Sequence, residues 1–141
     1  MNLGELMGIW PMLLLGLFIP FLARLEGVPA HGHQWLTSYL PGFGGVGLIC
    51  IFNLLPLLVV ALFALPNWRH PGFRFYASAL TCYWYLLVMH GRVDLASDAQ
   101  ASFALVFIPM RAMRFAIIGG LCGMVIDVTQ NRLKRSPCLE K

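Results

Sequence analysis

Two arginines, Arg111 and Arg114, lie inside the last long apolar run of the chain, residues 101–126. Their spacing of three places both side chains on one face of a helix. A guanidinium is always charged, and its planar set of donors matches carboxylates and phosphates. Charge inside a membrane-spanning helix is costly, and it commonly marks a binding site or a pathway. The pair is therefore the first candidate for chemistry, and that chemistry is the binding of an anionic group.

The apolar residues around the pair offset its cost only narrowly. Eleven Leu, Ile, Val and Phe residues lie between Phe103 and Ile126. On the insertion scale they favour the membrane by about 3 to 7 kcal/mol in total. Two arginines near the centre of the same helix cost about 5 to 7 kcal/mol. Because the segment alone is near balance, we expect groups outside it to stabilise the arginines, or the side chains to extend along the helix to the interface.

Polar groups in the other apolar runs are the nearest candidates. No carboxylate lies inside another apolar run, since the acidic residues stand at run ends or in loops. Asn53 lies at the centre of the second run, and Thr81 and Tyr85 lie on one stripe of the third. We therefore predict a polar layer at mid-membrane that forms a site for a partner or ligand. Its members are Asn53, Thr81, Tyr85, Arg111 and Arg114.

Two glycines mark a second face of the same segment. Gly119 and Gly123 form a small-residue pattern that lets another helix approach closely. At about 100° per residue they point roughly 150° away from the arginine pair. We predict helix packing at Gly119 and Gly123. The segment is then either the central helix of the bundle or the contact helix of an oligomer.

Other patterns for chemistry are weak. His31 and His33 flank a glycine, and His90 is expected on the same side of the membrane; imidazole suits zinc or copper. Loop histidines are more often simply solvated, so we predict no metal site and keep these three as weak candidates. The four cysteines form no C-x-x-C pair. Nucleophile, zincin and phosphate-loop motifs are absent from the sequence. We predict no enzymatic activity and no cofactor.

Four apolar runs must position these residues. Only helices and closed barrels satisfy backbone groups in lipid, and these runs are too long and too uniformly apolar for barrel strands. The sequence predicts an all-α integral membrane protein with four transmembrane helices in one domain, residues 1–141, ending in a short basic tail, residues 128–141. The expected spans are 6–23, 44–65, 74–90 and 101–126.

Basic residues predict the orientation. One side of the membrane would carry six of them and the other side two, so both termini are expected in the cytoplasm. The six are Arg69, Arg74, Arg132, Lys134, Arg135 and Lys141, and the two are Arg24 and Arg92.

Composition agrees with a membrane location. The 141 residues are 59% hydrophobic and only 11% charged, far from the quarter that is typical of soluble domains. The net charge of +4 comes with no basic patch interleaved with aromatic residues, so we expect no nucleic-acid partner. We predict a multi-pass protein of a bacterial inner membrane, in contact with the lipid bilayer.

The general plan resembles many small bacterial inner-membrane proteins, among them accessory subunits and immunity proteins against membrane-acting toxins. That resemblance covers architecture only. The function we expect is binding of a partner within the bilayer, either another membrane protein or a second copy. The alternative is oligomeric transport or binding of a small anion or an anionic lipid head group by the arginines, with Gly119 and Gly123 at the seam between copies.

Overall fold

The computed structural model describes residues 3–37, 42–67, 70–93 and 101–135, and every regular element in these ranges is a helix. The prediction of an all-helical chain is confirmed for this part. The elements are α1 Leu3–His31, α2 His33–Thr37, α3 Gly42–Leu62, the short 3-10 helix η1 Leu65–Asn67, α4 Phe73–Arg92 and α5 Ala101–Arg135.

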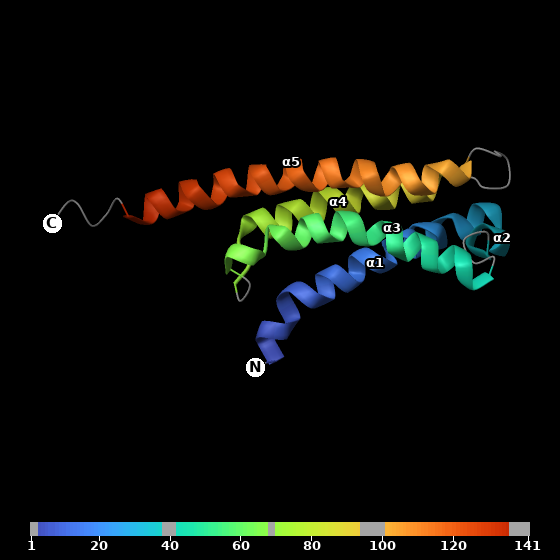
Figure 1. Ribbon diagram of the computed structural model, residues 1–141, viewed down its shortest axis with the longest axis horizontal. Helices are drawn as coiled ribbons and strands as arrows, with labels where there is room; N and C mark the ends of the chain where they lie inside the picture. The colour runs from blue at the N-terminus through green and yellow to red at the C-terminus, as the bar shows by residue number, and fades with distance from the viewer. Residues whose placement is uncertain (1–2, 38–41, 68–69, 94–100, 136–141) are drawn as a thin grey trace.

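The helices form an elongated bundle with α4 and α5 side by side along most of their length (Figure 1). These two run antiparallel, since Phe73 at the start of α4 meets Asp127 late in α5. α3 packs on α5, and α1 packs on α4 and α3. Thus α1 and α5 lie on opposite sides of the pair formed by α3 and α4.

Prolines interrupt the backbone hydrogen bonds of three helices. Each proline lacks the N–H that would bond the carbonyl four residues earlier. Pro11, Pro20 and Pro29 lie in α1, which follows a curved path (Figure 1). Pro56 lies in α3 and Pro109 in α5. The apolar neighbours in the bundle hold these helices continuous through the breaks.

The core combines large and small residues, and small ones lie where α4 and α5 approach closely. Ala79 and Cys82 of α4 are fully buried, as are Ala112 and Ala116 of α5. Large apolar side chains also lie outside on every long helix, for example Leu80, which is 70% exposed. Exposed apolar surface of this extent marks a membrane or protein contact rather than a solvated surface.

Two helices are long and apolar enough to cross a membrane, over residues 9–31 of α1 and 103–133 of α5. Gly47–Leu62 of α3 is apolar but shorter. By length and composition alone, these two helices suggest a membrane protein. The four spans, the inner membrane and the cytoplasmic termini stay predictions.

Two predicted boundaries differ from the structure by eight or nine residues, and the others differ by three or fewer. The first helix continues eight residues past the expected end at 23, because Arg24 is buried inside the bundle and does not begin a loop. The last helix continues through Arg135, into the expected basic tail. Its polar final turns contain no proline or glycine, and Pro137 is the first helix-breaking residue that follows.

Candidate binding surface

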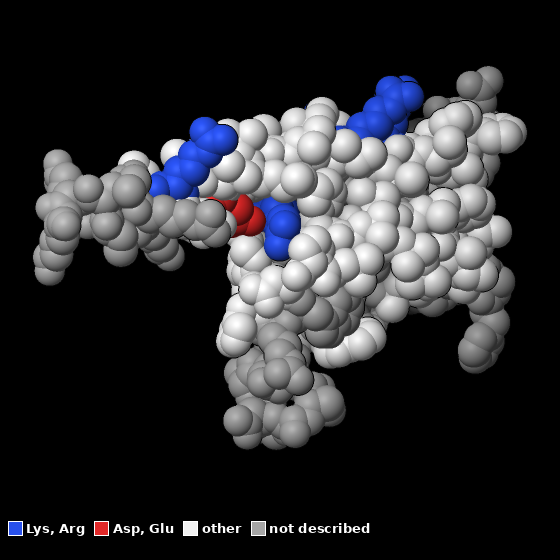
Figure 2. Space-filling view, turned by 60° about the vertical axis from the view of Figure 1, so that its left-hand side comes forward, with Lys and Arg blue, Asp and Glu red and all other residues white. Residues whose placement is uncertain are grey.

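Arg111 and Arg114 are both exposed, on the side of α5 that faces away from α3 and α4. Their neighbours on this side are large apolar residues, of which Phe107 and Ile118 are more than half exposed. Figure 2 shows isolated basic side chains standing out from wide uncharged areas. We call this stripe the α5 outer face. Its residues are Phe103, Phe107, Met110, Arg111, Arg114, Ile117, Ile118 and Leu121.

The structure does not bring the five residues of the expected polar layer together. The Thr81 hydroxyl lies 2.8 Å from the carbonyl oxygen of Phe115 and 2.9 Å from that of Ala77. The Tyr85 ring stacks on the Phe115 ring, with centroids 4.5 Å apart. Thr81 and Tyr85 thus attach α4 to α5 through Phe115, while the two arginines lie outside the bundle.

Asn53 lies apart from both the exposed arginines and the contact of Thr81 and Tyr85 with Phe115. Its side chain is completely buried, and neither its oxygen nor its nitrogen has a hydrogen-bond partner among the described residues. A buried polar group in this condition costs about 1 to 3 kcal/mol. The same helix contains Pro56, which leaves the carbonyl of Phe52 without its usual donor. Asn53 is therefore polar and central, as the sequence suggested, but separate from the arginines.

The glycine pattern of α5 is used inside the chain. A Cβ on Gly119 would collide with the Thr81 side chain and the Ala77 backbone of α4. A Cβ on Gly123 would collide with the backbone of Arg74, also in α4. Both glycines are buried, so they do not offer a face to another chain.

At the start of α4, a carboxylate caps the helix, a role that was not predicted from the sequence. Asp127 of α5 accepts hydrogen bonds from the backbone N–H of Phe73 at 2.9 Å and of Arg74 at 3.4 Å. Its carboxylate also lies 3.8 Å from Arg74 Nε. Negative charge at a helix N-terminus satisfies free amides and the helix dipole. The sequence did contain a signal for this cap, because Asp127 and the start of the third expected span were both expected on the cytoplasmic side.

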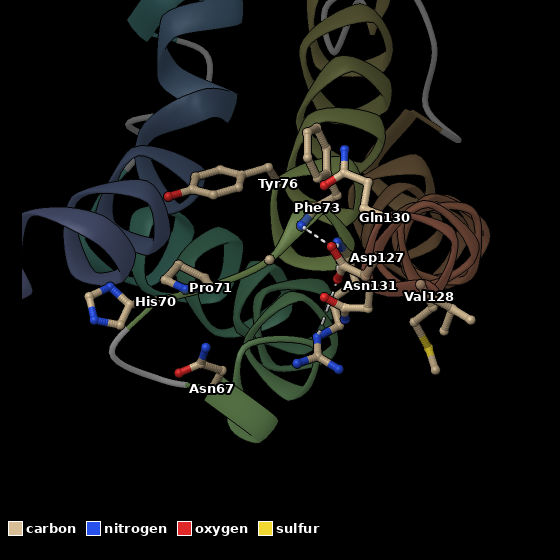
Figure 3. A pocket seen from close by; sticks show the side chains of 12 residues that line it. Asn67, His70, Pro71, Phe73, Tyr76, Asp127, Val128, Gln130 and Asn131 are labelled. Atoms are coloured by element: carbon tan, nitrogen blue, oxygen red, sulfur yellow. Dashed lines mark hydrogen bonds and ion pairs between the residues drawn. The ribbon is translucent and has the colours of Figure 1, made fainter. Parts of the chain in front are cut away.

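A groove of about 610 Å³ opens beside this cap. Figure 3 shows Asp127 turned toward the Phe73 amide, with His70 and Asn67 across the hollow. The amides of Asn67, Gln130 and Asn131 form part of its polar lining, and Tyr76 adds an aromatic wall. The groove joins the segment after α3 to the last turns of α5.

Arg24 forms a second contact that the sequence analysis missed. It is fully buried, it donates a hydrogen bond to the carbonyl oxygen of Val93, and its guanidinium lies 4.0 Å from the centroid of the Trp35 ring. This cation–π contact and hydrogen bond attach α1 to α2 and to the end of α4. Expected in a loop, the residue is instead a structural contact.

The histidines are spread over different surroundings. His31 stacks on Trp35 with ring centroids 4.1 Å apart, His33 is exposed and His90 is buried. Within the described ranges, no group of three or more His, Cys, Asp or Glu side chains is placed to hold a metal ion.

The two arginines lie nearer the Arg24 end of the bundle than the Asp127 end. Arg114 and Arg111 precede Asp127 by 13 and 16 residues, which is about 20 and 24 Å along α5. Hydrocarbon is about 30 Å thick. If Asp127 lies at one boundary, both arginines fall in the third of the membrane nearest the other boundary rather than at its middle.

Comparison of the chain with protein-family models, with curated proteins and with solved structures gives no match. The α5 outer face is thus interpreted from its own residues alone.

Proposed function

We propose that the chain is a four-span inner-membrane protein with both termini in the cytoplasm. α3 and α4 have 21 and 20 residues, about 30 Å each, which is long enough to cross hydrocarbon beside α1 and α5. Large exposed apolar side chains on both helices, such as Ile51 and Trp84, support this assignment. The basic residues support the orientation.

This protein works by binding a partner within the bilayer through the α5 outer face, as an accessory subunit or an immunity-type protein does. The observation that carries the proposal is the exposure of Arg111 and Arg114 on an apolar face. Neither has an ion-pair partner among the described residues, where the single ion pair joins Arg74 to Asp127. An arginine at the bilayer centre costs about 2.5 to 3.5 kcal/mol, and less nearer the boundary; an acidic or carbonyl-rich partner surface offsets that cost.

Binding is also what the shape of this surface favours. The arginines lie on a convex helix face, whereas small-molecule sites are usually concave. The transport alternative needs Gly119 and Gly123 at a seam between copies, and both face α4 instead. The geometry thus favours a protein contact over an anion pathway.

The test removes both charges. The double variant Arg111→Leu with Arg114→Leu is expected to insert as well as the natural chain, because two costly charges are gone. It should nevertheless lose the membrane protein that co-purifies with the natural chain in mild detergent. Arg132→Leu, which removes an exposed charge near the other end of the same helix, is the matched control and should retain that partner. Unchanged co-purification with the double variant would rule the proposal out.

A further inference from the structure

We propose that the partner is a second copy of this chain, whose α1 docks on the α5 outer face so that Arg111 pairs with Glu26 of the second copy. This inference rests on the proposed function and names the partner. The two surfaces that meet at this interface lie on different helices of the molecule, one on α1 and the other on α5.

The first observation is that α1 carries an exposed apolar face of its own. We call it the α1 outer face; its residues are Leu14, Leu15, Phe18, Leu22, Leu25 and Glu26. Since α1 and α5 lie on opposite sides of α3 and α4 (Figure 1), one molecule can use both faces at once. Apolar side chains of the two stripes would then pack together.

The second observation is complementary charge. Glu26 is exposed at the end of the α1 outer face and has no ion-pair partner among the described residues. The other acidic side chain that the structure describes is Asp127, which is already bound to α4. Glu26 is therefore the described carboxylate that is free to meet an arginine of another copy.

The third observation is the level of the two residues along the bundle. Thr81 contacts α5 between Phe115 and Gly119, so Arg111 lies about 9 Å from Thr81 toward the end of α4. Gly91, ten residues beyond Thr81, approaches the carbonyl oxygen of Ala23, which places Glu26 about 20 Å from Thr81 in the same direction. The two α-carbons thus differ in level by about 10 Å.

The direction of the side chains closes this gap. In a helix each Cα–Cβ bond tilts toward the N-terminus. α5 begins at the Arg24 end of the bundle, so the Arg111 side chain extends toward the Arg24 end. α1 begins at the Asp127 end, so the Glu26 side chain extends toward the Asp127 end. The two long side chains point toward one another across a contact between parallel copies.

Arg114 finds a different group in the same arrangement. Arg114 lies about one turn from Arg111 toward the Asp127 end of the bundle, close to the level of Phe18 in the α1 outer face. An aromatic ring face attracts a guanidinium, most strongly where water is excluded. Both arginines are then accommodated, one by a carboxylate and one by a ring.

Because the two faces differ, the contact is head-to-tail and generates a ring or a chain of copies. This property supplies a sharp experiment. We expect that Glu26→Arg alone and Arg111→Glu alone each weaken self-association by about tenfold or more, since like charges then meet at the interface. An equal mixture of the two variants should associate again, because each remaining contact joins opposite charges. The measurement is energy transfer between donor- and acceptor-labelled copies in liposomes.

Arg92→Glu is the matched control, because it reverses an exposed charge at the same end of the bundle outside both faces, and it should leave energy transfer unchanged. Failure of the mixture to associate overturns the inference. If natural copies show no transfer while the arginines retain a different membrane protein, the second copy is refuted and the proposed function stands. If removing the arginines releases only anionic phospholipid, both proposals are refuted.

Discussion

Arg111 and Asn53 are polar side chains with opposite surroundings in the bundle. The arginine lies outside, on apolar surface. The asparagine lies inside, where the described neighbours give it no hydrogen bond. From sequence alone both are simply polar residues in apolar runs, because a run does not reveal which face of its helix is buried. The rotation of α3 and α5 about their axes decides this, and it depends on the packing of all the helices together.

Asn53→Leu tests the interior position. Replacing an unsatisfied buried amide by an apolar side chain of similar size should raise the free energy of unfolding by about 1 to 2 kcal/mol. Unfolding in mixed detergent micelles measures it, with Leu54→Ala on the exposed side of the same helix as a control for α3. Destabilisation by Asn53→Leu would mean that the amide has a partner and a role.

At the scale of elements, the glycines of α5 determine how closely it approaches α4. The sequence identified Gly119 and Gly123 as a packing pair and left open whether another helix of the chain or another chain would use them. In the structure they face α4, where Thr81 and Arg74 occupy the space that a Cβ would need. Sequence could find the motif because small residues four apart are visible in a single segment. It could not find the partner, since that requires the register of two helices.

Gly123→Leu should separate α4 from α5, because the added side chain meets the Arg74 backbone, which cannot move aside. We expect loss of several kcal/mol of stability, in line with other overpacked cores. Gly47→Leu is the matched control, since a Cβ there meets open space. Thermal unfolding of both variants in detergent gives the comparison, and equal stability of the two would contradict this packing.

At the scale of the whole molecule, the described helices expose many large apolar side chains, which favours contact with lipid or with another protein. The sequence predicted the helices well because long apolar runs leave few alternatives. It misplaced Arg24, whose charge suggested a loop, because burial of this arginine depends on Trp35 in α2 and on Val93, which lies 69 residues later in the chain. Chain topology across the membrane is the property that now needs measurement.

Single cysteines in a cysteine-free background test the topology. Asn67→Cys and Asn131→Cys should react with an impermeant maleimide only from the cytoplasmic side. His33→Cys and Arg92→Cys should react only from the opposite side. All four positions are exposed, so access depends on the side and not on burial. Labelling of all four from one side would exclude a four-span arrangement.

The Asp127 cap also orders events during synthesis. The backbone amide of Phe73 is capped by a carboxylate that is synthesised 54 residues later in the chain. At translation rates of about 5 to 20 residues per second, that delay is about 3 to 11 seconds. During this interval the start of α4 has neither its cap nor the α5 glycines against it. A nascent chain stopped before residue 127 would therefore hold the start of α4 without its carboxylate cap and without the close contact with α5.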